Sequence, residues 1–345
     1  MPRLTQFSPG AGCGCKISPR DLETILSGTK TTQQQFKNLI VGNNTKDDAA
    51  VYDLENGTSI ISTTDFFTPI VDDPYYFGKI ASVNAISDIY AMGGTPLMAI
   101  AILGWPLEKL PAEIASKVID GAKDACKEAG IPLAGGHSID ICDPIFGLAV
   151  TGTIETANIK KNCSATENCS LYLTKPLGIG LLTTAEKRSQ LKDEHKNIAI
   201  ELMSKLNKIG EKLGKLNCVK AMTDVTGFGL LGHLLEVCEG SNLNAQLEFN
   251  AIPKIKGYED YIELKTIPGG TYRNWKSYGD KIAKITEQQK FILCDPQTSG
   301  GLLIAVEQSE EKAFFKIIEE AELELTKIGH LYQRESLNQP FIYIN

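Results

Sequence analysis

A polar segment, Thr156–Cys169, divides the 345-residue sequence into two halves that each mix strand-like and helix-like patterns. In the first half, Ser59–Thr63 and Ile145–Val150 have the short apolar character of strands. Apolar residues recur at helical spacing over Phe77–Met92 and Ala112–Ala129, and both runs stop at glycine. Because strands and helices in one region bury their apolar faces against each other, this half is expected to form a layered domain.

The second half repeats the mixture. The predicted strands are Leu171–Thr174, Val219–Val225, Ala245–Phe249 and Leu302–Val306, and the predicted helical regions are Lys187–Leu213, Gly229–Cys238 and Glu310–Glu322. A short helix is also expected at Asp21–Ser27, followed by a loop over Gly28–Lys37. The length suits two domains. We therefore expect a flexible N-terminal loop at 1–20 and two domains of α/β or α+β type, at 21–157 and 158–345; the resemblance described below implies that the first is α/β and the second α+β.

Charge and cysteine content exclude several classes of protein. A net charge of −7 argues against non-specific nucleic-acid binding, because phosphates would be repelled. The longest apolar stretch, around Leu97–Leu103, is too short to span a membrane, and no signal peptide is recognised. Nine scattered cysteines without a C-x-x-C pair do not form a secreted disulfide framework or a structural zinc site. A reducing cytoplasm is the expected location.

The loop Gly10–Lys16 holds three glycines, two cysteines and a lysine. Glycine at this density argues against regular structure. Cysteine reacts as the thiolate, and a neighbouring lysine favours that form. A transferring phosphoryl group also needs positive charge beside it. The alternative is a frayed terminus without function.

Aspartates lie near the ends of several predicted elements, at Asp47, Asp48, Asp65 and Asp224, and Asp88 interrupts an otherwise apolar helix. Asn84 lies one helical turn before Asp88, on the same face. Carboxylates from separate segments suit Mg²⁺, which would bridge them to nucleotide phosphates. For any single aspartate, a helix cap or a surface ion pair is the simpler interpretation. Several in comparable positions favour a metal–phosphate site.

Glycine motifs give weaker signals. No P-loop pattern occurs, but Gly227–Gly232 matches G-x-G-x-x-G, with Glu248 where a ribose-binding acid would lie. Asp224 opposes this dinucleotide-binding alternative, because its charge would repel a pyrophosphate. Gly135–Ser138 is expected to end a strand and to offer backbone and side-chain donors, although a structural histidine is an equal alternative. For Asp295–Gly301, residue chemistry alone favours a plain turn.

Taken together, these motifs resemble the selenophosphate synthetase family, the selenide, water dikinases of the aminoimidazole-ribonucleotide-synthetase-like ATP-binding superfamily. The likeness runs nearly end to end. It rests on Gly10–Lys16, Thr45–Ala50, Thr63–Phe67, Asn84–Gly94, Ala134–Asp140, Met222–Gly229 and Asp295–Gly301. The internal segments are shared in part with superfamily relatives, whereas Cys-Gly-Cys-Lys at 13–16 is typical of this family.

The resemblance implies that ATP, selenide and water are converted to selenophosphate, AMP and phosphate, with Mg²⁺ required. It implies Cys13 as the catalytic cysteine and Lys16 as an essential lysine. The implied metal ligands are Asp48, Asp88 and Asp224. The implied nucleotide contacts are Lys16, Thr45, Lys46, Asp47, Asp65, Asp88, Gly136, His137 and Ser138.

The resemblance also implies an α/β (α+β), two-domain aminoimidazole-ribonucleotide-synthetase-like fold with a flexible Gly/Cys-rich N-terminal loop. The N-terminal domain would bind ATP and form a homodimer through its sheet. A selenium-delivery protein is a further candidate partner, whereas nucleic acid and membranes are not expected. Two alternatives stay open: a superfamily relative acting as a kinase or cyclo-ligase on another small substrate, and a non-enzymatic Cys-x-Cys protein that binds metal or senses redox state.

Overall fold

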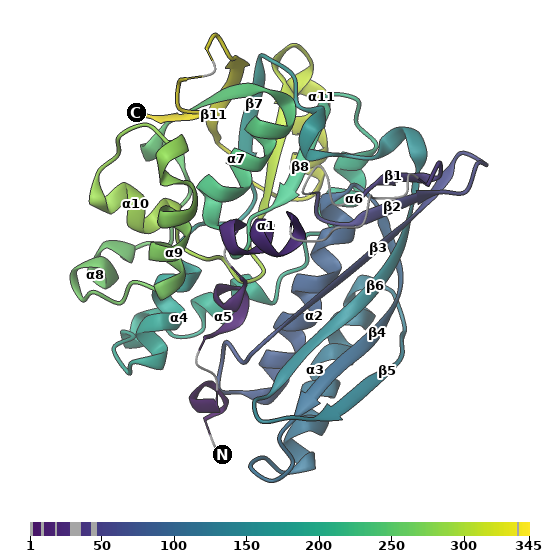
Figure 1. Ribbon diagram of the computed structural model, residues 1–345, viewed down its shortest axis with the longest axis vertical. Coiled ribbons are helices and arrows are strands. Elements are labelled where there is room, and N and C mark those ends of the chain that lie inside the picture. The colour runs from purple at the N-terminus through teal and green to yellow at the C-terminus, as the bar shows by residue number, and fades with distance from the viewer. Residues whose placement is uncertain (1–2, 8–9, 18, 28–35, 43–46, 337) are drawn as a thin grey trace.

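The computed structural model describes residues 3–7, 10–17, 19–27, 36–42, 47–336 and 338–345. Within these residues the chain forms two six-stranded sheets, each with helices packed against it (Figure 1). The change from one sheet to the other falls in the segment that the sequence marks as polar, because β6 ends at Glu155 and β7 begins at Cys169. None of the described helices is long and apolar enough to cross a membrane.

The first sheet has the strand order β1-β2-β3-β6-β4-β5. Its strands are β1 (Leu39–Val41), β2 (Ala50–Asp53), β3 (Thr58–Phe67), β4 (Thr95–Trp105), β5 (Leu133–Asp140) and β6 (Ile145–Glu155). Neighbours pair antiparallel except β4 and β5, which are joined by the crossover helix α3 (Ala112–Ala129) and run parallel. The predicted strands at 59–63 and 145–150 and the predicted helix at 112–129 are confirmed.

Helix α2 (Pro74–Ala91) lies between the first sheet and the second domain. It begins where the Asp73 side chain accepts a hydrogen bond from the Tyr76 backbone N–H, with Pro74 in the first turn. Its side chains are buried on nearly all sides, which explains the continuous apolar character of the sequence. One face of α2 packs on the first sheet, so polar residues on its other face lie against the second domain.

The second sheet has the order β12-β9-β11-β7-β10-β8. Its strands are β7 (Cys169–Leu173), β8 (Val219–Asp224), β9 (Leu243–Leu247), β10 (Leu302–Glu307), β11 (Lys327–Gln333) and β12 (Ile342–Ile344). Its helices are α4 (Ile179–Lys187), α5 (Ile198–Met203), α6 (Ile209–Gly214), α7 (Gly229–Ser241), α8 (Tyr258–Glu263), α9 (Gly269–Tyr278), α10 (Glu287–Leu293) and α11 (Glu311–Glu320). The predicted strand 245–249 ends early, because a 3-10 helix begins at Phe249.

The dinucleotide-binding alternative is wrong. Strand β8, which precedes the glycine motif, is an edge strand whose neighbour β10 runs antiparallel to it. A dinucleotide fold requires parallel strands at that position. Glycine serves a different purpose here: Gly229 begins α7 with φ +71°, where a Cβ would come within 2.8 Å of the Cys294 carbonyl carbon.

The N-terminal segment lies between the two domains. It contains a 3-10 turn at Leu4–Phe7, a second at Gly12–Cys15 (η2) and helix α1 (Pro19–Ser27), which includes the predicted short helix. Leu4 and Cys13 are buried. The two 3-10 turns are thus anchored in the core, whereas the apolar side chains Leu22, Ile25 and Leu26 of α1 are exposed. Most of the predicted loop 28–37, together with Thr45 and Lys46, lies outside the described residues.

Candidate active site between the two domains

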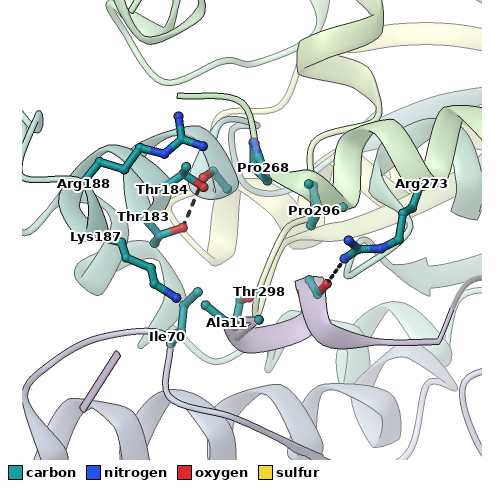
Figure 2. Close-up of a pocket in the computed structure, with 15 residues that line it drawn as sticks. Ala11, Ile70, Thr183, Thr184, Lys187, Arg188, Pro268, Arg273, Pro296 and Thr298 are labelled. Carbon is teal, nitrogen blue, oxygen red and sulfur yellow. Dashed lines mark hydrogen bonds between the residues drawn. The ribbon is translucent and has the colours of Figure 1, made fainter. Parts of the chain in front are cut away.

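The Cys13 loop separates two very different environments. On one side a cavity of about 470 Å³ opens, lined by residues of η2, α4, α9 and the segment around Pro296 (Figure 2). On the other side are the carboxylates predicted from the sequence. Two hydrogen bonds fix the loop between the cavity and the carboxylates. The Cys13 backbone N–H donates to Thr298 Oγ1 at 3.0 Å, and Arg273 Nη2 donates to the Gly14 carbonyl at 2.6 Å.

Three aspartates converge from distant parts of the chain. Asp48 precedes β2, Asp88 comes from α2 and Asp224 ends β8, and they offer carboxylate oxygens that lie within 4.8 Å of one another. Threonine side chains orient two of them: Thr63 Oγ1 donates to Asp88 Oδ2 at 2.5 Å, and Thr223 Oγ1 donates to Asp48 Oδ1 at 2.9 Å. The sequence thus identified a set that the fold brings together.

This aspartate cluster is electrostatically unfavourable without a cation. Burial raises the pKa of Asp48, Asp88 and Asp224, and the charge of Asp224 raises the pKa of the other two further. Asp48 Oδ2 and Asp224 Oδ2 are buried and have no hydrogen-bond partner among the residues that the structure describes. Unsatisfied buried carboxylate oxygens call for a partner. A hard divalent cation meets that need, because its preferred ligands are carboxylate oxygens.

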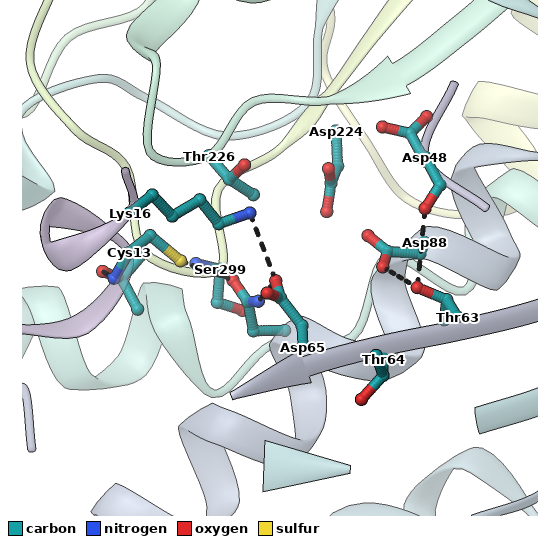
Figure 3. A network of polar contacts seen from close by, with 12 residues as sticks. Cys13, Lys16, Asp48, Thr63, Thr64, Asp65, Asp88, Asp224, Thr226 and Ser299 are labelled. Atoms are coloured by element: carbon teal, nitrogen blue, oxygen red, sulfur yellow. Dashed lines mark hydrogen bonds and ion pairs between the residues drawn. The ribbon is translucent and has the colours of Figure 1, made fainter. Parts of the chain in front are cut away.

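Asp65 connects the aspartate cluster to the cysteine loop (Figure 3). It lies on β3, and its Oδ2 accepts from Asn84 Nδ2 at 2.5 Å and pairs with Lys16 Nζ at 3.4 Å. Asn84 in turn accepts a hydrogen bond from Cys13 Sγ at 3.1 Å through its Oδ1. Asn84 and Asp88, one turn apart on α2, therefore serve the two halves of one site. The helical spacing indicated their common face but not that Asn84 would contact Cys13.

The Cys13 side chain is only 1% exposed, and burial raises the pKa of its thiol well above the ordinary value, although Lys16 acts in the opposite direction. The sequence-based expectation that Lys16 favours the thiolate is therefore outweighed in this arrangement. Burial would lower the pKa of Lys16, but Asp65 and the other nearby acids raise it, so its ammonium group stays charged. The Cys13 side chain is therefore a thiol, and it donates its hydrogen bond to Asn84.

The segment Asp295–Gly301 is not a plain turn. Asp295, Gln297, Thr298 and Ser299 are all buried. Ser299 has φ +52°, and its backbone N–H donates to Asn84 Oδ1 at 2.9 Å, beside the Cys13 thiol. Residue chemistry could not separate a buried loop from a surface turn, because both use small polar residues and glycine.

The predicted nucleotide contacts divide into those near this site and those away from it. Asp65 and Asp88 lie in it, whereas Asp47 accepts a hydrogen bond from the Asn162 backbone N–H at 2.6 Å. Gly136, His137 and Ser138 lie on β5, which β6 and β4 separate from β3 in the sheet. Because neighbouring strands are about 4.8 Å apart, the distance from β3 to β5 across the sheet is roughly 14 Å. Within one chain, these three residues therefore lie three strands away from Asp65 on β3.

The expectation that a strand ends at Gly135 was wrong. Strand β5 continues through the glycines to Asp140. A Cβ on Gly136 would lie 2.3 Å from the Ala101 carbonyl oxygen on β4, so glycine permits the close pairing of the two strands. Similarly, Gly227 of the G-x-G-x-x-G motif allows close approach of the cysteine loop, because a Cβ there would lie 2.6 Å from the Cys13 carbonyl oxygen.

Comparison with known proteins agrees with this architecture. Residues 46–154 match the AIR synthase related protein N-terminal domain, and residues 166–338 match the C-terminal domain of the same family. A selenide, water dikinase of Pasteurella multocida is 59% identical over 333 residues, which cover 96% of this chain and 95% of that protein. One from Photobacterium profundum is 60% identical over 331 residues, covering 95% of each.

Solved structures share the fold at low identity. A thiamine monophosphate kinase from Aquifex aeolicus has a TM-score of 0.64 and 16% identity, covering 94% of this chain and 95% of its own. The hydrogenase maturation protein HypE in complex with ATP has a TM-score of 0.65 and 18% identity, covering 99% and 94%. The expected two-domain fold is confirmed. The chain belongs to the AIR synthase related proteins and, within them, to the enzyme family of the selenide, water dikinases.

Proposed function

We propose that this enzyme converts ATP, selenide and water to selenophosphate, AMP and phosphate, as the name of its 59–60% identical relatives indicates. The observation that carries the proposal is the hydrogen-bonded path from Cys13 through Asn84 to Asp65 and Lys16, next to three clustered aspartates. This interdomain site combines a soft nucleophile, a cation and carboxylates that suit a hard metal ion. Such a combination suits the transfer of a phosphoryl group to selenium.

We assign Asp48, Asp88 and Asp224 as the residues that hold Mg²⁺. Their converging oxygens, two of which have no partner within the described part of the chain, fit a hard dication. When bound, Mg²⁺ would offset negative charge on the ATP phosphates. Thr63 and Thr223 orient two of the three carboxylates, so replacing either threonine should weaken metal binding without removing a ligand.

In the proposed reaction, a lone pair on selenium attacks the γ-phosphorus, and the bond from that phosphorus to the bridging oxygen breaks, leaving ADP bound in the site. Water later cleaves the ADP-level intermediate to AMP and phosphate. Lys16 stays protonated beside Asp65 and stabilises charge on the transferring group. Cys13 contacts and shields the selenium without forming a bond to it. Its raised pKa means that the loop must shift, or a proton must leave, before it acts as a thiolate.

The remaining nucleotide contacts are proposals of the same kind. Asp47 and Asp65, with Thr45 and Lys46, are assigned to the nucleotide on the side of the first sheet. Gly136, His137 and Ser138 are exposed on the edge strand of that sheet. A homodimer formed through this domain would allow one chain's β5 to reach its partner's nucleotide. The cysteines of this chain are free, in keeping with the proposed cytoplasmic location.

Two cysteine variants test the reaction. Anaerobic incubation of the wild type with ATP and selenide should give AMP, phosphate and a phosphorus NMR signal from phosphorus bonded to selenium. Cys13→Ser should abolish that signal, whereas Cys15→Ser, which changes an exposed thiol two residues away, should retain much of it. ATP binding should survive in both variants. ADP as the sole stable nucleotide product would indicate an ordinary kinase.

The same pair of variants addresses the non-enzymatic alternative. A two-thiol metal or redox site would be damaged equally by either substitution. The geometry favours the enzyme, since Cys13 is buried against Asn84 while Cys15 is exposed. Among the described residues, the set suited to a metal ion consists of aspartates and includes neither cysteine.

A further inference from the structure

The cavity beside the Cys13 loop has an unusual charge. Of the described residues that line it, those with charged side chains are Lys187, Arg188 and Arg273, and no acid lines it. In Figure 2, Lys187 points its amino group toward Ile70 and Ala11 at the loop, while Arg273 reaches the loop from the opposite wall. A purely cationic lining in a chain of net charge −7 attracts anions locally.

This cationic cavity adjoins the Cys13 site. Gly14, Gly270 and Arg273 line both the cavity and a second, much smaller one, which is also lined by Cys13 and Lys16. Arg273 and Gly14 lie at the boundary between the two cavities and are joined by a hydrogen bond, in which Arg273 Nη2 donates to the Gly14 carbonyl at 2.6 Å. Arg273 is exposed, and this contact holds it at the one place where the two cavities share their walls.

The opposite side of the loop is unsuited to an approaching anion. Asp65, Asp88 and Asp224 lie there, and the proposed nucleotide phosphates would add further negative charge. In-line phosphoryl transfer also requires that the nucleophile arrive on the side away from the leaving group. A nucleophile that carries negative charge is therefore expected to enter from the cationic side.

We propose that the cavity lined by Lys187, Arg188 and Arg273 is the entry site for the anionic selenium donor, hydroselenide, and that Arg273 positions the anion at the passage to Cys13. The proposal rests on the proposed function for the identity of the anion. The access of an anion to Cys13 through this cavity can be measured without turnover.

The first experiment compares two alkylating reagents of similar size, anionic iodoacetate and neutral iodoacetamide, on the full-length chain. The Cys15→Ser background keeps the Cys13 peptide unambiguous, and exposed Cys142 serves as the internal reference. The readout is the ratio of the iodoacetate rate to the iodoacetamide rate at Cys13, relative to the same ratio at Cys142. Because both reagents need the same thiolate, any change in the Cys13 pKa cancels in this ratio.

Two variants remove the cationic lining: Arg273→Gln, and the double variant Lys187→Gln/Arg188→Gln. The matched control, Lys212→Gln/Lys215→Gln, removes two exposed lysines that line a different cavity with no lining residue in common. Both cavity variants should lower the ratio by about threefold or more, with a smaller effect at high salt, and the control should not. An unchanged ratio in both cavity variants, or an equal fall in the control, would overturn the proposal.

Steady-state kinetics identify the anion. Arg273→Gln should raise the KM for selenide by about three- to tenfold and leave the KM for ATP nearly unchanged. A rise in the KM for ATP alone would assign Arg273 to the nucleotide and refute the entry site. If the wild type makes no selenophosphate, the proposed function fails, while the alkylation ratio still decides whether this cavity guides anions to Cys13.

Discussion

Cys13 illustrates how a side chain's surroundings determine its chemistry. Its thiol donates to Asn84 and is shielded from solvent, and burial outweighs the effect of Lys16 on its pKa. A buried thiol resists oxidation better than an exposed thiolate. The structure therefore corresponds to a protected resting state, from which the loop must change before Cys13 reacts.

The aspartate cluster gives the first prediction at this scale. Asp88→Asn and Asp224→Asn should each fold normally and lose about 100-fold or more of ATP turnover, because a neutral amide is a poor ligand for a hard dication. Raised Mg²⁺ or Mn²⁺ should restore part of the activity. In metal-free buffer their Tm should equal or exceed that of the wild type, since one repelling buried charge is gone.

Asp120→Asn, on the exposed side of α3, is the control for these variants and should keep wild-type turnover. Normal turnover of Asp88→Asn and Asp224→Asn at ordinary Mg²⁺ would mean that both aspartates are structural. The metal would then have to bind elsewhere.

Asp295 gives a prediction about pH. Burial raises its pKa to about 8, even though Gln297 and the backbone N–H groups of Gly180 and Leu181 donate to it. Between about pH 4 and pH 8 the unfolded chain has lost this proton while the folded chain keeps it, so this group makes stability fall as pH rises. The slope is at most about 1.4 kcal/mol per pH unit.

Asp295→Asn imitates the protonated acid and should remove this contribution. Thermal unfolding of both proteins between pH 5 and pH 8 provides the measurement. The Tm of the wild type should fall relative to that of the variant as pH rises. Two curves that stay parallel across this range would show that the Asp295 carboxyl does not retain its proton in the folded chain.

At the scale of elements, helix α2 combines three tasks. It covers the first sheet, contacts the second domain and carries Asn84 and Asp88 into the site. Its position depends on a close crossing with α3, where a Cβ on Gly121 would lie 1.9 Å from the Tyr75 carbonyl oxygen. Because the two helices pack this closely, a small shift of α2 at its contact with α3 also moves Asn84 and Asp88 on its other side.

Gly121→Ala should therefore destabilise the protein by about 1–3 kcal/mol, because the added methyl group separates the two helices. At an exposed helix position the same change would stabilise by up to about 1 kcal/mol. The measurement is Tm, with Lys117→Ala on the exposed side of α3 as the control. A Tm at or above that of the wild type would show that the crossing yields without strain.

At the scale of the whole molecule, the first sheet has one face covered by α2 and α3 and one face on which none of the described helices packs (Figure 1). The uncovered face presents Tyr52, Phe66, Met98, Ile100 and Ile139, each between 46% and 50% exposed. Large apolar side chains gathered on one surface mark an interaction site. This face is consistent with the proposed homodimer through the N-terminal domain.

Ile100→Glu places a charge in the centre of that face and should convert a dimer to a monomer, as measured by light scattering after size-exclusion chromatography. ATP turnover should fall with it if β5 of one chain serves the partner's nucleotide. Leu264→Glu, at an exposed apolar position of the second domain, is the control. A dimeric Ile100→Glu variant, or a monomeric wild type, would contradict this arrangement.

Local patterns predicted helices α1, α2, α3, α7 and α11 and strands β3, β6, β7, β8, β9 and β10, but they missed strands β1, β2, β4, β11 and β12. Helical spacing gave the bounds of α3 and the common face of Asn84 and Asp88, because a 3.6-residue period leaves a direct trace in the order of residues. The resemblance added the proposed metal ligands, which no spacing could show. Predictions failed at the strand end expected at Gly135 and at the plain turn expected over Asp295–Gly301, because close strand pairing and buried loops use the same glycines and small polar residues as surface turns.

The sequence by itself determined the main helices and about half of the strands, the family and the residues available for chemistry, since these depend on neighbours along the chain. Only the tertiary structure decided that Asp48, Asp88 and Asp224 meet, that the loop at Asp295–Gly301 is buried against Cys13, and that β5 is held apart from the aspartates. Those outcomes depend on how α2 packs between two sheets. The protonation of Cys13 was likewise decided there, because desolvation depends on everything that surrounds a group and not on its sequence neighbours.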